Sequence, residues 1–536
     1  MNTDVIEAWM VAKVVEALDT PANEVDCNVP FTSLGLDSLT LLEMTGDLAE
    51  FTGCDIPVSL VWEFPNINAL AQQLSLLTPA IPDIATAAVA RDQPFLLSYA
   101  QERIWRDACH DEQGDRNSLL DQWTLSGPLD VDVLSQSLDE VIRRHEILRT
   151  IFTVEDGRPV QVIQPAESVV LLEVDLSSEA QPAEAAVRLL HEEAAQAFVL
   201  DGGSLFRARL FKLSELEYRV VFVLHHLLYD ATSLEVFYDE LSANYAALIG
   251  DGRLPVMGPP LQSADFALWQ REHLKADGAH YQKLMGWWQQ YWSGPLPSRL
   301  KLPSRWKAKN DQARVQGGVL VWEVPTELLV KLQDLSGQCS ATQFMLFYAA
   351  FEALLYQVTG QREMLIGSYV SDRSRPSAKQ AIGYYINLVA LRTRLSERPT
   401  FLEIVEQVRE KLQQVSIYQE LPYEDLVGVL KEEGRALTRL QVIFQQIPDL
   451  DQCLSLAGLE VERWGEQTQT QMPWGLTVNL MERADGVKVR LGFDANRYRP
   501  SKVRSLMKKY AAVLEQMGAD PAERVVPLRK RWLGIF

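Results

Sequence analysis

The chain has 536 residues, 47% apolar and 23% charged, a length and composition that predict several hydrophobic cores and exclude a disordered polypeptide. Its formal net charge of -21 excludes an overall basic surface and argues against a nucleic-acid partner. Residues 1–76 hold twelve Asp or Glu and one basic residue, Lys13, which predicts an acidic domain at the N-terminus.

The cysteines are scattered, without the paired spacing of a zinc site or a disulfide framework, so we expect no bound metal. They are Cys27, Cys54, Cys109, Cys339 and Cys453. Asp4 and Glu7 stand where a secretory signal would have basic residues, and Glu352 interrupts the longest apolar stretch, 344–356. We therefore expect a cytoplasmic protein with no membrane partner.

Residues 1–76 predict a four-helix bundle. Apolar residues recur with helical spacing over 5–18, and a second helical pattern covers 40–51. Shorter helices are predicted near Pro57 and near Asn66. Four helices in so short a stretch form a small bundle.

Asp37 and Ser38 precede the second predicted helix, where a polar side chain caps free backbone amides. Capping alone is one explanation of this pair. The strings LGLDSL (34–39) and VWEFPNINALAQQL (61–74), however, resemble the modification site and the last two helices of acyl and peptidyl carrier proteins. The resemblance implies a 4'-phosphopantetheine arm covalently attached to Ser38, whose thiol holds a substrate as a thioester. Helix dipoles favour its phosphate at that position.

The carrier motif departs from the usual peptidyl form, because Leu36 and Asp37 replace a glycine and a histidine. Leu-Asp-Ser-Leu is commoner in carriers that resemble polyketide or fatty-acyl carriers. The resemblance therefore implies a polyketide or fatty acyl donor rather than a plain peptide. The acidic surface is expected to attract a basic phosphopantetheinyl transferase.

Residues 77–93 predict a flexible tether. They contain Pro79, Pro82 and several small residues without clear periodicity. Fully extended, a tether of this length reaches on the order of 60 Å, which would let the first domain move relative to the rest of the chain.

From residue 94 onward, helical and strand patterns alternate. Helices are predicted at 134–145, 183–198, 234–248, 342–356 and 400–419, and strands at 160–163, 206–211, 218–224, 318–324, 364–369, 388–395, 440–444, 476–481 and 487–493. The alternation predicts two mixed α/β lobes, 94–270 and 271–520, followed by a tail at 521–536. The whole chain is thus of the α+β multidomain class, with an active site expected between the lobes.

The apolar run 218–224 ends in His225 and His226, so a buried strand would carry two imidazoles into the interior. Two core histidines bonded to the backbone are one explanation. The other is that His226, with an ordinary pKa near ~6.5, handles a proton at neutral pH while Asp230 fixes the turn.

Six strings that occur in one order favour the second explanation. They are LSYAQERIW (97–105), RRHEILRTIF (143–152), HHLLYDATS (225–233), SADFALW (263–269), IGYYINLVALRTRL (382–395) and YQELPYEDLV (418–427). Together they resemble the successive motifs of a non-ribosomal peptide synthetase condensation domain. The resemblance implies two lobes like those of chloramphenicol acetyltransferase, with a tunnel that admits a donor thioester from one face and an acceptor from the other.

The resemblance also implies roles for the residues. In amide formation the attacking amine loses a proton and an oxyanion is stabilised, and His226 would accept that proton or a hydrogen bond from the amine. His225 is expected to be structural. Asp230 is expected to form a salt bridge with Arg149 or Arg144, since buried carboxylates are rarely left unpaired.

Four more residues are placed near the tunnel by the resemblance: Asn387, Ala231, Ser233 and Trp474. For Asn387, an amide that bonds to the backbone at a strand edge is the alternative explanation. Ala231 replaces the glycine usual in the family, so either a positive φ is lost or an added methyl narrows the site. We expect an active enzyme with altered acceptor preference. The segment 472–476 also departs from the usual Phe-Asp-Leu near the donor side.

Other functions stay open. An epimerisation domain shares the two histidines and also follows a carrier, although 382–395 and 418–427 are of the condensation type. Heterocyclisation would need aspartate in place of the leading histidines. Ester formation and a non-catalytic recruitment platform are further alternatives. Because nothing resembles an adenylation domain, the expected partners are an upstream acyl-loading enzyme or module and a downstream acceptor carrier with its adenylation domain.

Overall fold

The computed structural model describes residues 3–52, 56, 58–75, 90–109, 118–166, 171–302, 317–373, 376–435, 440–465, 468–469, 474–483 and 486–528. Most of the predicted tether, and Met472 and Pro473 of the segment 472–476, lie outside the described residues. Within the described part of the chain, every helix is too short or too polar to cross a membrane.

The N-terminal domain is the predicted helical bundle. Its helices are α1 (Thr3–Leu18), α2 (Phe31–Leu34), α3 (Ser38–Thr52), α4 (Val58–Glu63) and α5 (Ile67–Ser75), with a 3-10 turn at Ala22–Glu24. Ile6, Met10, Leu48 and Leu70 are fully buried between them, as the helical spacing predicts. The Asp37 carboxylate caps α3, because its Oδ1 accepts a hydrogen bond from the Thr40 amide at 2.6 Å.

The first lobe is built on a mixed sheet in the order β12-β2-β7-β6-β5, with a smaller sheet β1-β4-β3 beside it. Its strands are β1 (Phe95–Leu96), β2 (Ser118–Ser126), β3 (Thr150–Glu155), β4 (Arg158–Ile163), β5 (Leu172–Asp175), β6 (Phe206–Ser214) and β7 (Glu217–His225). Its helices are α6 (Tyr99–Cys109), α7 (Val131–Arg144), α8 (Pro182–Ala195), α9 (Ala231–Gly250) and α10 (Ser263–His273), with a 3-10 turn at Glu146–Arg149.

The second lobe is built on a six-stranded sheet in the order β10-β9-β11-β14-β15-β8. Its strands are β8 (Gly317–Glu323), β9 (Glu363–Ser371), β10 (Ile386–Arg394), β11 (Val442–Gln446), β14 (Leu476–Arg483) and β15 (Gly486–Asp494). Its helices are α11 (Ala279–Tyr291), α12 (Thr326–Cys339), α13 (Gln343–Thr359), α14 (Pro376–Lys379), α15 (Phe401–Tyr418), α16 (Tyr423–Glu432) and α17 (Pro500–Ala519). The α13 helix is buried on nearly every side, which explains its continuous apolar sequence.

Two structural details bear on the expected domain boundaries. The strands β12 (Glu460–Arg463) and β13 (Thr468–Gln469) lie in the second half of the sequence but pair with β2 of the first lobe. The chain therefore returns to the sheet of the first lobe at 460–469, within the range expected for the second lobe. In the expected tail 521–536, the Val525 amide donates to the Pro399 carbonyl and the Leu528 amide to the Gln357 carbonyl, so residues up to 528 belong to the second lobe.

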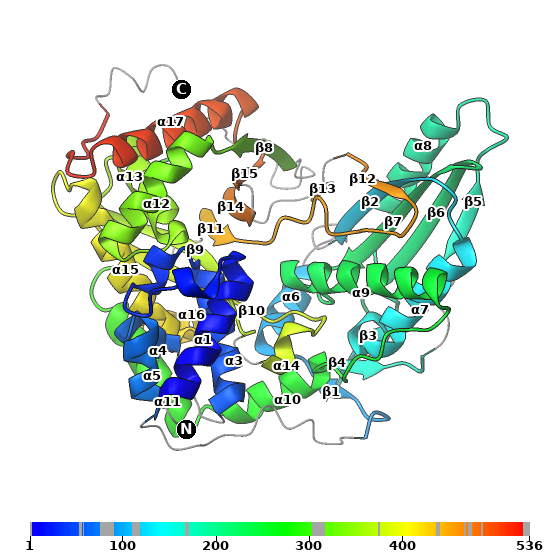
Figure 1. Ribbon diagram of the computed structural model, residues 1–536, viewed down its shortest axis with the longest axis horizontal. Helices are drawn as coiled ribbons and strands as arrows, with labels where there is room; N and C mark the ends of the chain where they lie inside the picture. Colours follow the sequence, from blue (N-terminus) through cyan, green and yellow to red (C-terminus); the bar gives the residue numbers. More distant parts are fainter. Residues whose placement is uncertain are drawn as a thin grey trace.

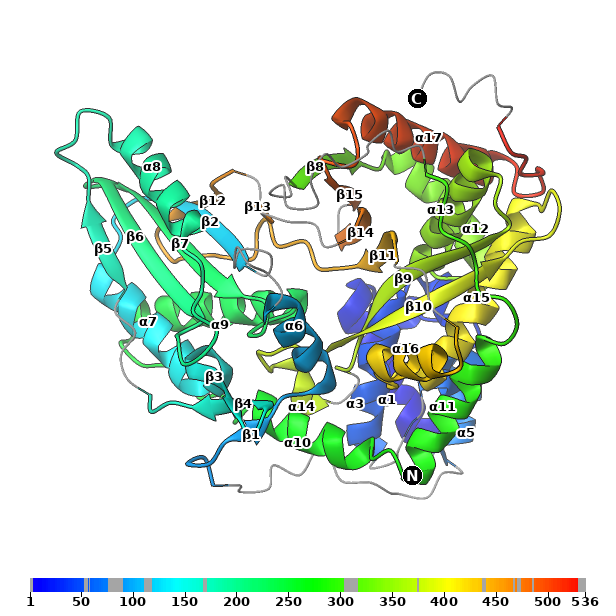
Figure 2. The same cartoon turned by 180° about the vertical axis from the view of Figure 1, so that it is seen from behind.

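The lobes lie side by side, and the N-terminal domain packs against the second lobe (Figures 1 and 2). Helix α2 contacts α12, α3 contacts α14, and α4 contacts α15. Lys379 of α14 forms an ion pair with Asp47 of α3 at 2.8 Å, and the Ser33 hydroxyl contacts the Gly337 carbonyl at 3.5 Å. Helices α2 and α3 thereby face the second lobe.

Candidate active site

The two histidines stand where β7 leaves the sheet. His225 is the last residue of β7 and pairs with Ser118 of β2, while His226 begins the turn that leads into α9. The strand is buried because Phe222 packs edge-on against Phe237 of α9 at 5.2 Å. The apolar run therefore does place both imidazoles at the inner end of a central strand.

His225 is enclosed by the first lobe and is only 2% exposed. Its Nδ1 accepts a hydrogen bond from the Leu227 amide at 3.3 Å, and its ring packs edge-on against Phe198. Burial lowers the pKa of His225 to about 3, and the neighbouring His226 contributes to the lowering. The ring is neutral at physiological pH, and its contacts are those of a packed core side chain.

His226 is half-buried and held in one orientation. Its Nδ1 lies 3.1 Å from the Tyr229 carbonyl, its ring stacks on Tyr229, and Tyr384 packs edge-on at 5.2 Å. Burial lowers the pKa of His226 to about 4, against the effect of the Tyr229 carbonyl, and the positive charge of Arg103 contributes to the lowering. Since a carbonyl only accepts hydrogen bonds, Nδ1 carries the proton and Nε2 is left as an acceptor.

Asp230 pairs with Arg373, and not with Arg149 or Arg144 as expected. Arg373 Nη2 donates to Asp230 Oδ1 at 2.8 Å, and both side chains are almost fully buried. The Tyr385 amide donates to Asp230 Oδ2 at 3.0 Å. The aspartate thus joins the start of α9 to the segment that follows β9.

The two candidate arginines of the string 143–152, Arg144 and Arg149, have other partners. Arg144 Nε donates to Glu240 Oε1 at 2.9 Å, which ties α7 to α9. Arg149 donates to the Gln164 carbonyl. The expected salt bridge of Asp230 with Arg144 or Arg149 was wrong, because the motif string does not determine which buried arginine the tertiary fold brings to Asp230.

Ser233 and Ala231 open helix α9. Asp230 and Ser233 form a capping box, and the Ser233 hydroxyl also donates to the Gly383 carbonyl at 2.6 Å. Ser233 is fully buried, and its hydroxyl is used by this network. Its expected position along a tunnel stays a prediction. Ala231 is half-buried at the first helical position and has no positive φ, which removes the strain explanation of its replacement of glycine.

A polar chain that sequence reasoning missed leads away from His226. Arg103 of α6 donates through Nη2 to Tyr384 Oη at 3.0 Å and through Nη1 to Tyr369 Oη at 3.3 Å. Trp474 Nε1 donates to the same Tyr369 hydroxyl at 3.3 Å. Helix α6 carries four charged residues, and nothing in its sequence marks Arg103 as the buried one that needs several partners.

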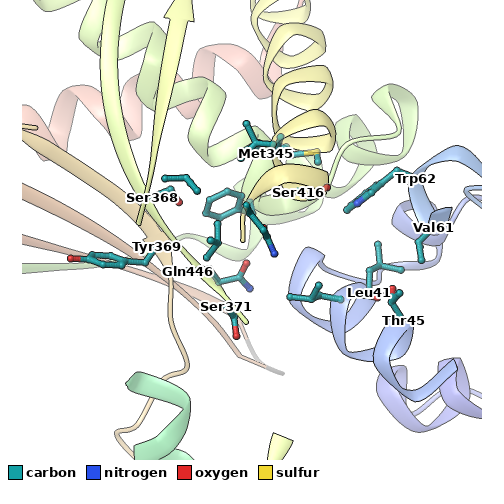
Figure 3. Close-up of a pocket in the computed structure, with 17 residues that line it drawn as sticks. Leu41, Thr45, Val61, Trp62, Met345, Ser368, Tyr369, Ser371, Ser416 and Gln446 are labelled. Carbon is teal, nitrogen blue, oxygen red and sulfur yellow. Dashed lines mark hydrogen bonds between the residues drawn. The ribbon is translucent and has the colours of Figure 1, made fainter. Parts of the chain in front are cut away.

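A cavity of about 180 Å³ separates α3 and α4 of the N-terminal domain from the second lobe (Figure 3). Its walls include Leu41, Trp62, Met345, Tyr369 and Gln446. Tyr369 connects this cavity to Arg103 and, through it, to Tyr384, whose ring packs against His226. The cavity therefore lies between the carrier-like domain and the two-lobed domain.

The start of α3 lies next to this cavity. Gln446 Nε2 donates to Asp37 Oδ2 at 3.2 Å, and Leu41, one turn further along α3, forms part of the cavity wall. An elongated arm attached at the start of α3 would therefore meet an opening into the second lobe rather than closed packing. The residues present fit a phosphopantetheine group in this respect.

Asn387 lies on β10 and bonds to the backbone. Its Nδ2 donates to the carbonyls of Gln419 and Leu421, both at 2.7 Å, and its Oδ1 accepts from the Leu388 amide at 2.9 Å. These contacts match the alternative explanation of Asn387, an amide that bonds to the backbone at a strand edge. It fixes the turn between α15 and α16.

The comparisons with known proteins agree with this geometry. Residues 92–529 match the family described as Condensation domain, and residues 8–74 match the family described as Phosphopantetheine attachment site. The chain belongs to the condensation-domain family. It is a carrier domain followed by a condensation domain of the non-ribosomal peptide synthetase type, and the carrier bears 4'-phosphopantetheine.

Curated relatives include much longer synthetases. A linear gramicidin synthase polypeptide of Brevibacillus parabrevis is 32% identical over 534 residues, which cover 97% of this chain and 10% of the relative. Phosphinothricin tripeptide synthetase PhsB of Streptomyces viridochromogenes is 29% identical over 524 residues, with 96% of this chain and 43% of the relative covered. The chain thus spans less than half of either relative.

Solved structures confirm the predicted two-lobed fold. The X-domain from teicoplanin biosynthesis superposes with a TM-score of 0.71 at 27% identity and covers 83% of this chain and 99% of its own. The first condensation domain of the calcium-dependent antibiotic synthetase superposes with a TM-score of 0.65 at 22% identity and covers 81% and 99%. These condensation-type lobes are the expected α+β architecture.

Proposed function

We propose that the condensation domain transfers an acyl group from a thioester on its own carrier to the amine of an aminoacyl thioester on another carrier, forming an amide. The observation that carries this proposal is the orientation of His226. Its Nδ1 proton is used by the Tyr229 carbonyl, which leaves Nε2 able to accept a proton or a hydrogen bond.

In the proposed reaction His226 accepts a proton or a hydrogen bond from the attacking amine, and no covalent enzyme intermediate is required. A general base of this kind contributes about 10²–10⁴-fold to the rate. Asp230 acts through architecture, because both of its oxygens are occupied by Arg373, Ser233 and the Tyr385 amide. His225 holds the end of the strand.

Ser38 is the proposed attachment residue of the phosphopantetheine arm, which supplies the donor as a thioester when bound. Asp37 caps the helix on which Ser38 stands and bonds to Gln446 of the second lobe, so the chain itself orients this site. The Leu-Asp-Ser-Leu form of the motif supports a polyketide or fatty acyl donor.

The test is to load Ser38 with an acyl-pantetheine, add an aminoacyl carrier and follow the products by mass spectrometry. Amide product supports condensation, and it should be lost in Ser38→Ala and reduced about 10²–10⁴-fold in His226→Ala. An inverted α-carbon without transfer supports epimerisation instead. A hydroxyacyl acceptor in the same assay distinguishes ester formation.

A second candidate function is a recruitment platform that binds a partner enzyme without catalysis. The specific observation in its favour is the likeness to the teicoplanin X-domain, which has been solved in a complex with OxyB. His226 and its neutral, oriented imidazole favour catalysis over this alternative. Complete absence of amide and epimerised product from the wild-type chain would favour the platform.

A further inference from the structure

Three side chains with metal-binding atoms come together from distant parts of the sequence, apart from His226. His273 ends α10, His280 lies at the start of α11, and Glu420 follows α15. The Nε2 atoms of His273 and His280 lie 3.3 Å and 2.8 Å from the same oxygen, Glu420 Oε2. The three ligand atoms all lie within 4.8 Å of one another.

Each of these side chains is held in place. Trp269 stacks on the ring of His273 at 4.8 Å, and the centres of the two imidazole rings lie 4.4 Å apart. Asn387 binds the carbonyls on both sides of Glu420, so the backbone that carries the carboxylate is fixed at two points. The cluster is therefore preorganised by the same amide that sequence reasoning placed near the tunnel.

We propose that His273, His280 and Glu420 bind one divalent transition-metal ion, with zinc as the natural occupant. Two imidazoles and one carboxylate are a ligand set that zinc prefers, and they exclude magnesium and calcium, which prefer oxygen ligands alone. Ligand atoms in a tetrahedral zinc site lie roughly 3.3–3.6 Å apart, so a small outward shift of the carboxylate admits the ion. The side chains are about one third exposed, which leaves room for water to complete the coordination.

The bound ion fastens a connection between the lobes. On the first-lobe side, Arg271 of α10 donates to the Leu97 carbonyl at 2.9 Å. On the second-lobe side, the indole of Trp288 on α11 donates to the Tyr418 carbonyl at 2.8 Å. Because Glu420 lies next to this second contact, the ion would link the end of α10 to the turn between α15 and α16.

The experiment measures zinc binding to the full chain without an affinity tag, by equilibrium dialysis after removal of metal. We expect one zinc ion per chain, with affinity reduced at least about tenfold in His273→Ala, His280→Ala and Glu420→Gln. His191→Ala is the matched control, because His191 is an exposed histidine on α8, and it should bind as the wild type does.

Cobalt absorption is a second measurement. Histidines with only a structural role would not affect it. Cobalt added to the metal-free chain should give visible bands that disappear in the two histidine variants and persist in His191→Ala. Circular dichroism confirms that each variant is folded. If the wild type binds zinc no more tightly than His273→Ala and gives no cobalt bands, the three residues form a hydrogen-bonded cluster only and the proposal is wrong.

Discussion

The imidazole of His226 is oriented by a backbone carbonyl, whereas the nearby carboxylate serves another group. Asp230 is used by Arg373 and by the cap of α9, so it fixes the turn that carries the histidine. Burial keeps the ring neutral, because a charged imidazole would lose its hydration without gaining a close anion. The Tyr229 carbonyl therefore orients the imidazole of His226, and burial, not Asp230, determines its charge.

The lowered pKa of His226, about 4, predicts a flat pH profile. Amide formation should be independent of His226 protonation between about pH 6 and 8 and should decline only as the pH approaches 4. Since the ring binds its proton more readily in the unfolded chain, where its pKa is near ~6.5, folding stability is also lost as the pH falls from about 6.5 toward 4. The measurement is kcat/KM for amide formation against pH, and an apparent pKa near 6.5 would contradict the prediction.

Breaking the buried ion pair should destabilise the protein strongly. Arg373→Ala leaves the Asp230 carboxylate buried without its counter-charge, and we expect the free energy of unfolding to fall by about 3–5 kcal/mol. Arg149→Ala is the control, because Arg149 donates to a backbone carbonyl and not to Asp230. Urea unfolding measures both variants, and equal losses would mean that Arg373 has no special role.

At the residue scale the sequence named the candidate residues, whose roles stay predictions, and it revealed only part of their hydrogen bonding. His226 and Asp230 lie together because the turn between them is short, and short-range geometry follows from the string itself. Arg373 is 143 positions from Asp230, so only the tertiary fold decides that it, and neither Arg144 nor Arg149, reaches the carboxylate. The Ser233 hydroxyl takes part in the cap of its own helix, a contact that the motif string did not reveal.

Among the elements, helix α9 begins directly after the turn that carries His226. Asp230 caps the helix, Ala231 occupies its first position, and the backbone there is regular. The methyl of Ala231 is therefore a steric feature of the helix start rather than a source of strain. Glycine at this position would create space without relieving the backbone.

Ala231→Gly should change acceptor preference while preserving the fold. The cost in helix stability is at most about 1 kcal/mol, since glycine is unfavourable mainly in helix interiors. We expect bulky acceptors to gain rate relative to small ones, because the methyl is removed from a half-buried position. Competition between aminoacyl acceptors of different size measures this, and unchanged rates for every acceptor would show that the methyl is irrelevant.

Strong periodicity explains which elements were predictable. The buried run that became β7 and the amphipathic pattern that became α7 lie within a few residues of their predicted bounds. The strands β12 and β13 were missed, because strands of four and two residues hold too few side chains to show a period. Their pairing with β2 depends on the return of the chain to the first lobe, which no local pattern encodes.

On the scale of the whole molecule, the carrier is held against the second lobe by a few polar contacts. The ion pair of Lys379 with Asp47 and the hydrogen bond of Gln446 with Asp37 both involve α3 or the residue before it. Partly exposed pairs of this kind contribute little each, so the contact is specific without being permanent. Such a contact would suit a carrier that, on the proposed function, also has to reach other enzymes.

Reversing one charge in this contact should slow transfer from the tethered carrier. Lys379→Glu replaces the attraction to Asp47 by repulsion, and we expect a decrease in amide formation of up to about fivefold. Lys508→Glu, the same change on an exposed position of α17, is the control and should have no effect. High salt should reduce the difference between the two variants, and a rate equal to the wild type at low salt would contradict the docking contact.

The position of Asp37 against Gln446 has a kinetic consequence. On the proposed function, a phosphopantetheinyl transferase would modify Ser38 and an upstream partner would deliver the acyl chain at the same first turn of α3, beside which Asp37 contacts the second lobe. Only one protein surface can contact that turn at a time. The carrier would therefore bind the second lobe, the transferase and the upstream partner one after another. On the proposed function every product then requires one release and one return of the carrier, and the frequency of this exchange sets an upper limit on turnover that no change at His226 can raise.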